Sequence, residues 1–399
     1  MPPLTGLKVV ELARVLAGPW AGQILADLGA EVTKVESLAG DETRAWGPPW
    51  IENTDGSRDA AYFHSCNRGK TSIAIDFASE DGRRIVTRLI AGADVVIENF
   101  RVGTLAKYGF DYASTKQLNP RIVYCSITGF GQDGPYRDRP GYDFVVQAMG
   151  GIMDLTGDPA GPPEKIGVAY ADIMTGLYAV VAIQAALAHR ERTGEGQSID
   201  MALLDTQVGT LANQAMNYLA SGIAPGRMGN AHPNIVPYQE FPTRDGHLVV
   251  AVGNDGQFRQ FVRVLGVEGL ADDPAFATNA VRVKNRSALV AGLTGLTSGF
   301  GRDELLARLA EAGVPAGPIN TVADVFADPQ VIHRGMRIDL PRDGGGPVPS
   351  VRTPIVMDGS PPAYGQAAPR HGEHTASILQ GIGCGAEEIA RLKSSKVTN

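Results

Sequence analysis

Residues 7–36 read LKVVELARVLAGPWAGQILADLGAEVTKVE, and the order of patterns within them decides the fold. The apolar, β-branched run at 7–13 predicts a buried strand, and 31–36 predicts another. Between them, residues 18–30 predict a helix that ends near Gly29. We therefore expect the chain to begin with a strand, a helix and a second strand.

The same alternation continues through the first half of the chain. Strands are predicted at 71–77, 94–99 and 121–127, and residues 79–93 predict a helix that starts at a serine cap. Helical stretches follow from Tyr142 to Met153 and, after the segment 196–204, as far as about Leu219. Short apolar strands that alternate with helices indicate an α/β fold, in which a parallel sheet carries helices on both faces.

The pattern changes after residue 220. Residues 221–237 are rich in Gly, Pro and Asn, which predicts a linker or an irregular functional loop. Residues 238–253 predict a hairpin around Asp245–Gly246, and helices are predicted at 255–266, 283–296 and 302–312. We expect this region to form a second, smaller α+β domain. The tail beyond it is loop-rich and ends in a short predicted helix near 385–393.

Composition excludes several classes of function. The 399 residues carry a formal net charge of -7, which gives no electrostatic case for binding nucleic acid or an anionic membrane. The three cysteines have no CxxC spacing, so we expect no zinc or other metal site and a cytoplasmic location. The N-terminus lacks the pattern of a secretory signal. Residues 173–188 are the best candidate for a membrane span, but their Gly, Ala, Thr and Gln content favours a buried helix.

Two short motifs resemble phosphate-binding loops without their context. GFGQDG (129–134) has the spacing of a dinucleotide fingerprint, which requires a helix directly after it. Pro135 and Pro140 interrupt that position, so a glycine turn is the better interpretation and a nucleotide-binding regulatory or redox protein is disfavoured. GKTS (69–72) lacks the first P-loop glycine, because His64 stands in its place.

Asp172 is a single carboxylate in the apolar segment GVAYADIMTGLYAVVAIQAALAH (167–189). Aspartate is a preferred helix cap, so from local sequence alone capping is the simpler role. A catalytic role is compatible with it, because the free N–H groups of a helix N-terminus keep a carboxylate ionised and can stabilise an oxyanion. Local sequence leaves both roles open.

Several long segments together resemble family III CoA-transferases, the group that contains formyl-CoA transferase, carnitine-type CoA-transferases and α-methylacyl-CoA racemases. They occur in family order, cover nearly the whole chain and include residues 7–36, NRGKTSIAIDF, DVVIENFRVGTL, GPYRDRPGYDFVVQAMGG, GVAYADIMTGLYA and GVPAGPINTVADVFADPQV. The segment GNAHPNIVPYQ (229–239) is most similar to the branch of succinate–hydroxymethylglutarate CoA-transferase.

The resemblance implies a large Rossmann-like domain built from both ends of the chain, and two subunits interlocked as a homodimer. It divides the chain into residues 1–220 of the large domain, a linker at 221–237, a small α+β domain at 238–325, and residues 326–399, which return to the large domain.

The resemblance also implies the site. The nucleophilic carboxylate of the family falls on Asp172, and coenzyme A enters as a substrate, with no permanently bound cofactor. The positions that contact CoA in the family fall on Val15, Leu16, Ala17, Ile75, Asp76, Asn99, Phe100, Arg101, Lys107, Tyr142 and Asp143. Formyl-CoA transferase has an arginine at the position of Ser37, so one contact to CoA is missing here, and the glycine-rich loop over the acyl pocket has no assigned counterpart.

Other residues are weaker candidates. Arg44, Arg101 and Lys107 could bind CoA phosphates or a carboxylate, although solvated surface charge is the simpler role of each. His232 and Asn234 are candidates for the acceptor site, with Arg227 nearby as a carboxylate clamp.

The resemblance predicts the following reaction. Asp172 attacks an acyl-CoA, forming an aspartyl anhydride and then an aspartyl-CoA thioester, from which a carboxylate acceptor takes the CoA. We expect succinyl-CoA and a dicarboxylate as substrates. The alternative is a 2-methylacyl-CoA racemase; that branch has a histidine base where this chain has Tyr142, whose ordinary pKa of about 10 suits base catalysis poorly.

Overall fold

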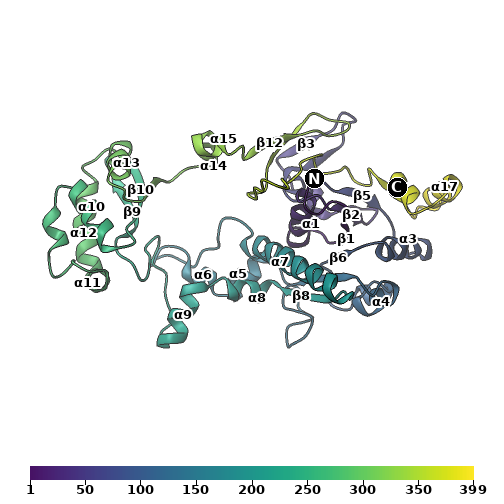
Figure 1. Ribbon diagram of the computed structural model, residues 1–399, viewed down its shortest axis with the longest axis horizontal. Coiled ribbons are helices and arrows are strands. Elements are labelled where there is room, and N and C mark those ends of the chain that lie inside the picture. The colour runs from purple at the N-terminus through teal and green to yellow at the C-terminus, as the bar shows by residue number, and fades with distance from the viewer. The chain divides into compact units, whose positions relative to one another are not determined.

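The computed structural model, which describes residues 1–399, places six parallel strands in one sheet (Figure 1). Their order is β5–β2–β1–β6–β7–β8, and every neighbouring pair is parallel. The bounds are β1 (Lys8–Leu12), β2 (Glu31–Glu36), β5 (Thr71–Ala74), β6 (Val95–Glu98), β7 (Val123–Thr128) and β8 (Ser198–Ala202). The α/β class is confirmed. The strand order reverses between β1 and β6, and such a switch point is where open α/β sheets bind ligands, at the carboxyl ends of the strands.

Helices cover both faces of this sheet. On one face, α1 (Ala17–Asp27) and α7 (Tyr170–Thr193) pack on alternate strand residues such as Val9 and Ile97. On the other face, Val10 and Val96 belong to one apolar core with buried residues of α3 (Glu80–Ala91), α16 (Thr375–Gly381) and α17 (Ala386–Ser394). A parallel sheet buried on both faces explains why its strands are apolar runs rather than alternating ones.

Several predicted boundaries match the structure. α1 ends at Asp27, just before Gly29, whose φ of +99° lies in the left-handed region that glycine adopts readily. The Ser79 hydroxyl accepts a hydrogen bond from the N–H of Gly82 at the start of α3, as its predicted cap role requires. In the middle of the chain, β9 (Tyr238–Thr243) and β10 (Gly246–Ala251) form the predicted hairpin.

Two predicted helices are each divided. The stretch from Tyr142 to Met153 forms α5 (Asp143–Met149) and α6 (Ile152–Leu155), separated at Gly150 and Gly151, where Gly151 has a φ of +84°. The stretch ending near Leu219 forms α8 (Leu203–Gly209) and α9 (Ala212–Ser221). After GFGQDG the chain forms turns and no helix begins before α5, in agreement with a glycine turn.

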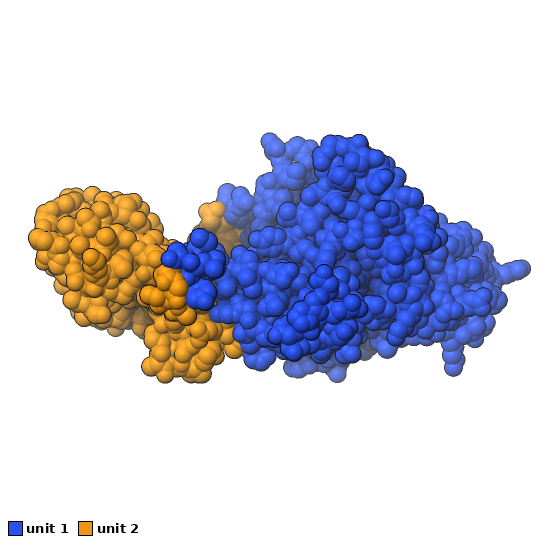
Figure 2. Space-filling model, turned by 90° about the horizontal axis from the view of Figure 1, so that it is seen from below, with its two compact units in different colours: residues 1–152, 166–220, 332–399 blue, residues 153–165, 221–331 orange.

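The chain divides into two units (Figure 2). Unit 1 contains Met1–Ile152, Ile166–Ala220 and Ile332–Asn399, and unit 2 contains Met153–Lys165 and Ser221–Val331. Residues 153–165 were expected in the large domain, but they pack with unit 2, because the Arg227 guanidinium hydrogen-bonds to Asp154, Asp158 and Gly161. Residues 221–237 belong to the same unit, and unit 2 extends beyond the expected end at 325.

Unit 2 has a core of its own. Its antiparallel sheet has the order β11–β10–β9, with β11 at Ala316–Pro318. Buried Phe241, Phe258 and Phe261 lie in this core. The helices of this part are α10 (Asp255–Val264), α11 (Asn279–Lys284), α12 (Arg286–Thr297), α13 (Arg302–Glu311), α14 (Val322–Ala327) and α15 (Pro329–His333), which ends in unit 1.

Short elements complete unit 1. They are the pairs β3 (Trp50–Glu52) with β4 (Arg58–Ala60) and β12 (Arg337–Leu340) with β13 (Val348–Val351), and the helices α2 (Ala61–His64) and α4 (Tyr112–Leu118). Single helical turns lie at η1 (Glu42–Ala45), η2 (Leu105–Tyr108) and, in unit 2, η3 (Glu268–Ala271).

α7 is the one helix whose length and apolar composition would allow it to cross a membrane. In the structure it is the central helix on its face of the sheet, and its buried residues include Thr175, Ala179 and Ile183. Its opposite face exposes Leu177, Tyr178 and Val181. The interpretation of this segment as a packed helix therefore holds for one of its two faces.

Candidate active site

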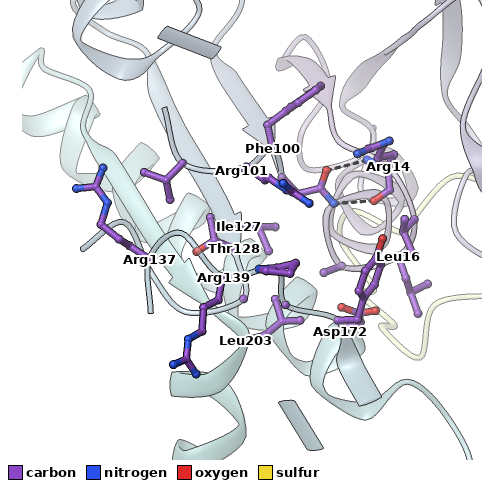
Figure 3. A pocket seen from close by; sticks show the side chains of 18 of the residues that line it. Arg14, Leu16, Phe100, Arg101, Ile127, Thr128, Arg137, Arg139, Asp172 and Leu203 are labelled. Carbon is purple, nitrogen blue, oxygen red and sulfur yellow. Dashed lines mark hydrogen bonds between the residues drawn. The ribbon is translucent and has the colours of Figure 1, made fainter. Parts of the chain in front are cut away.

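A pocket lies at the carboxyl ends of β1, β6 and β7, at the switch point of the sheet (Figure 3). Its walls come from the loops that follow these strands and from the start of α7. The lining includes Arg14, Val15, Leu16, Ala17, Glu42, Asn99, Phe100, Arg101, Thr128, Gly129, Arg137, Arg139, Tyr142, Asp172 and Leu203. All of these residues belong to unit 1. The structure thus brings together eight of the predicted site residues.

The loop between β1 and α1 presents backbone donors to the pocket. Val15 has a φ of +69°, an unusual value for a β-branched residue, and Leu16 is the N-cap residue of α1, whose side chain makes no capping hydrogen bond. The N–H groups of Leu16, Ala17 and Gly18 have no acceptor within the protein. The free N–H groups at a helix N-terminus form a site for negative charge.

Asn99 ties this loop to the end of β6. The N–H of Arg14 donates to Asn99 Oδ1 at 3.0 Å, and Asn99 Nδ2 donates to the Arg14 carbonyl at 2.6 Å (Figure 3). The side chain of Asn99 therefore fixes the backbone of the neighbouring loop.

Asp172 is the third residue of α7, not its cap. Its carboxylate accepts no hydrogen bond from the protein and has no ion-pair partner, although it lies at the pocket wall. Burial, and after it the negative charge of Asp143, raises the pKa of Asp172 from 3.8 to about 7. The helix N-terminus was expected to keep this group ionised, but burial and the charge of Asp143 instead raise its pKa and favour its neutral form.

Asp143 caps the start of α7, a role that was expected for Asp172. Its Oδ1 accepts the N–H groups of Ala171 at 2.8 Å and of Asp172 at 3.4 Å, and its Oδ2 accepts Gln147 Nε2 at 2.7 Å. The start of α7 is thus capped by a carboxylate from α5. Since these N–H groups are already occupied, they cannot act as oxyanion donors, which corrects the second expectation for this helix.

The pocket is positively charged overall. Four arginines line it, namely Arg14, Arg101, Arg137 and Arg139, against two carboxylates, Glu42 and Asp172. Arg14 pairs with Glu42 at 3.0 Å, whereas Arg101 has no acidic partner. Arg137 and Arg139 point away from Asp172 in Figure 3. Several arginines at one pocket suit an anionic ligand such as a phosphate or a carboxylate.

Four predicted contact residues do not line this pocket, namely Asp143, which caps α7, and Ile75, Asp76 and Lys107. Ile75 is fully buried in the core, and Asp76 accepts the N–H of Ala78 in the turn before α3. Phe77, the next residue, lines a neighbouring hollow with Ser37, Arg14 and Phe100. Lys107 is exposed on η2.

The substrate candidates also lie elsewhere. Arg44 is buried and pairs with Glu36 at 2.7 Å and Asp59 at 3.1 Å, so neither substrate binding nor a solvated surface position describes it. His232 and Asn234 belong to unit 2, where His232 Nδ1 accepts the N–H of Asn234 at 3.1 Å. Arg227 is engaged in its hydrogen bonds to residues 154–161.

Sequence reasoning missed Glu42, Arg137, Arg139 and the capping role of Asp143. The segment RDRPGYD (137–143) carries three of these, and its two arginines directly before a turn were the available signal. No group of three or more His, Cys, Asp or Glu side chains is placed to hold a metal ion.

Comparisons with known proteins give a consistent result. The model of CoA-transferase family III matches residues 4–375. A succinate–glutarate CoA-transferase of Agrobacterium fabrum is 56% identical over 380 residues, which cover 95% of this chain and 95% of that protein. A succinyl-CoA:glutarate CoA-transferase of Mus musculus is 43% identical, with 96% of this chain and 87% of that protein covered. The crystal structure of a CAIB/BAIF family protein from Brucella suis has a TM-score of 0.85 and 61% identity, with 95% and 99% covered.

Proposed function

The chain belongs to CoA-transferase family III, as an enzyme that moves CoA between an acyl-CoA and a dicarboxylate, and we propose that Asp172 is the nucleophile of that transfer. One observation carries the proposal. In the pocket at the switch point, Asp172 is a partly buried carboxylate without any protein partner, and the free N–H groups at the start of α1 line the same pocket. An unpaired carboxylate beside unused donors suits covalent catalysis.

The transfer proceeds in two symmetric halves. The Asp172 carboxylate attacks the thioester carbonyl of the donor, which forms an aspartyl anhydride and releases CoA thiolate. The thiolate then attacks the aspartyl carbonyl of the anhydride, which gives an aspartyl-CoA thioester and frees the donor acid. The acceptor carboxylate attacks this thioester and forms a second anhydride, from which the returning thiolate takes the acceptor acyl group and restores Asp172.

Each of these steps places negative charge on a carbonyl oxygen. The N–H groups of Leu16 and Ala17, which line the pocket, are the donors that we assign to this charge, because those at the start of α7 are occupied by Asp143. α7 contributes the nucleophile and α1 contributes the oxyanion donors.

We propose succinyl-CoA as donor and glutarate or a similar dicarboxylate as acceptor. The support is that the bacterial relative is named a succinate–glutarate CoA-transferase and the mouse relative a succinyl-CoA:glutarate CoA-transferase. Arg101, which has no acidic partner in the pocket, is the side chain that we assign to a substrate carboxylate or CoA phosphate. Racemase activity is disfavoured by Tyr142. Deuterium exchange at the α-carbon of a 2-methylacyl-CoA in D2O would instead favour the racemase over the CoA-transferase.

We further propose that the enzyme is an interlocked homodimer. The support is a set of exposed apolar side chains in unit 1, a kind of surface that marks an interaction site. They are Leu177, Tyr178 and Val181 on α7, Phe144, Val145 and Met149 on α5, and Met216, Tyr218 and Leu219 on α9. A cytoplasmic location and the absence of a resident cofactor are part of the same proposal, and the three unpaired cysteines support the former.

The test is a panel of acyl-CoA donors and carboxylate acceptors, read by mass spectrometry, with succinyl-CoA and glutarate at its centre. The native enzyme should form glutaryl-CoA, and hydroxylamine should attack the aspartyl carbonyl of the Asp172–CoA thioester, release CoA and leave a hydroxamate on Asp172. Asp172→Asn should lower turnover by about 10³-fold or more, since it removes the nucleophile.

Asp205→Asn, at an exposed carboxylate on α8, is the matched control and should retain full activity. Near-native turnover in Asp172→Asn would rule out the assignment of the nucleophile.

A further inference from the structure

The loop that presents the oxyanion donors rests on a set of fully buried charges. The loop spans residues 13–19, from the end of β1 into the first turn of α1. Below it lie Glu11 on β1, Lys34 on β2 and Lys70 before β5, all at most 3% exposed. None of the three lines the pocket that contains Asp172, and Lys34 lines the neighbouring hollow that Ser37 and Phe77 also line.

Lys34 holds the beginning of the loop. Its Nζ donates to the Ala13 carbonyl at 2.7 Å, to Glu11 Oε1 at 3.2 Å and pairs with Asp41 Oδ2 at 3.0 Å. The three donors of the ammonium group are thereby used. Asp41 in turn accepts the N–H of Val15 at 3.4 Å with its other oxygen.

Lys70 holds the end of the loop. Its Nζ donates to the Pro19 carbonyl at 2.8 Å, to Asn67 Oδ1 at 2.9 Å and to the Glu11 carboxylate, at 2.8 and 3.0 Å from its two oxygens. One carboxylate, that of Glu11, therefore joins the two lysines that hold opposite ends of one loop. A Cβ at Gly22 would overlap this carboxylate, so α1 crosses directly over it.

The charges of the set balance. Glu11 and Asp41 carry two negative charges and Lys34 and Lys70 carry two positive ones, and each ammonium has a full set of acceptors. Buried ion pairs contribute little net stability compared with apolar side chains, but they fix geometry wherever every donor is satisfied. The geometry fixed here is that of a loop backbone with a positive φ at Val15. The N–H donors of this loop must already be in position when CoA binds.

We propose that Glu11, Lys34, Asp41 and Lys70 are positioning residues, which hold the loop 13–19 in its CoA-binding form from beneath. The inference rests on the proposed function in one respect, that CoA binds against this loop. Loss of the set leaves Asp172 in place but loosens the loop, so that the affinity for CoA falls together with the rate.

The chain provides a matched control two residues away. Arg68 is also buried and lies in the same segment, but its guanidinium pairs with Asp27 at the end of α1, with hydrogen bonds of 2.8 and 2.6 Å. Lys70→Met and Arg68→Met each remove one buried cation below α1, the first at the loop and the second at the far end of the helix.

The experiment measures the Kd for CoA by calorimetry, kcat and KM for succinyl-CoA, and the melting temperature. Lys70→Met should raise the Kd for CoA at least tenfold, whereas the Kd of Arg68→Met should stay within threefold of the native value. This difference should hold even if the two variants melt at a similar temperature. An equal loss of CoA affinity in both variants, or native affinity in Lys70→Met, would overturn the proposal, because a purely structural role follows melting temperature alone.

A milder pair decides the case in which Lys70→Met does not fold. Glu11→Gln and Asp27→Asn preserve side-chain shape and remove one buried negative charge each, and the same tenfold and threefold limits apply. Asp172→Asn separates this proposal from the catalytic one, because it should bind CoA normally while it abolishes transfer. If the native enzyme binds CoA but transfers nothing, the proposed function fails while the comparison of Lys70 with Arg68 still stands.

Discussion

Asp172 must be ionised to attack a thioester, yet the structure surrounds it with features that favour its neutral form. Burial and the nearby charge of Asp143 raise its pKa to about 7. A higher pKa makes the carboxylate more nucleophilic once it forms, at the cost of a smaller ionised fraction. Since the group is protonated below pH 7, the kcat/KM of the enzyme should rise with pH through that value.

Replacement of Asp143 by asparagine should move this pH profile. Asp143→Asn keeps an oxygen for the N–H of Ala171 but removes the negative charge beside the nucleophile. The pKa of Asp172 should then fall, and the acidic limb of kcat/KM should shift to lower pH by up to about one unit. The measurement is kcat/KM between pH 5 and 9 for the native enzyme, Asp143→Asn and the control Asp205→Asn. If the acidic limb of the kcat/KM profile stays at the native pH in Asp143→Asn, the charge of Asp143 does not affect the pKa of Asp172.

Single residues also mark where sequence reasoning reached its limit. Asp172 was found because its segment matches a family motif, and Val15, Leu16 and Ala17 because they fall on positions that contact CoA in the family it resembles. The cap of α7 could not be found, because it comes from Asp143, 29 residues earlier, and capping rules examine adjacent positions only. Arg44 was misjudged because its partner Asp59 lies on β4, a strand of three residues whose pattern is too short to recognise.

At the scale of elements, the contact between α1 and α7 determines how Asp172, the proposed nucleophile, faces the proposed oxyanion donors. Gly176 lies one turn after Asp172, and a Cβ there would lie 2.6 Å from the Ala17 carbonyl. The missing side chain lets the helices approach at the level of the pocket. The strands of the large sheet were predictable from their apolar runs, but this close approach depends on two helices about 150 residues apart.

Gly176→Ala should separate these two helices. The added methyl cannot fit without a backbone shift, so we expect a loss of about 1–3 kcal/mol in stability and at least a tenfold loss in kcat. Chemical denaturation and steady-state kinetics measure the two effects. Gly292→Ala in α12 is the control, since nothing lies within 4 Å of its Cβ, and it should gain about 0.5–1 kcal/mol. Native kcat in Gly176→Ala would contradict the role of this contact.

At the scale of the whole molecule, the two units have separate cores, and their sequence boundaries differ from those expected. The change in composition at residue 221 was visible in the sequence. That residues 153–165 belong to unit 2 was not visible in the sequence, because it depends on hydrogen bonds from Arg227, some 70 positions later. When a short internal segment packs with the other unit, the amino-acid composition of the segment does not reveal it.

The proposed dimer predicts the effect of a charge on the exposed face of α7. Val181 is 60% exposed there, so Val181→Asp should leave the protomer folded but place an unpaired carboxylate in the interface. We expect at least a tenfold weaker dimer by sedimentation equilibrium. Leu118→Asp, at an exposed apolar residue of α4, which belongs to a different part of unit 1, is the control and should remain dimeric. A native sedimentation profile in Val181→Asp would exclude α7 from the interface.

The donors at the start of α1 have a consequence for how this enzyme can be studied. The N–H groups of Leu16 and Ala17 belong to the main chain, so replacing either side chain leaves the donor where it was. If these N–H groups act as proposed, an alanine scan would pass over them without a signal, and natural variation at these positions would look neutral. Replacing the backbone amide of Ala17 with an ester by chemical synthesis removes that donor alone, and is the kind of substitution by which such a site becomes visible.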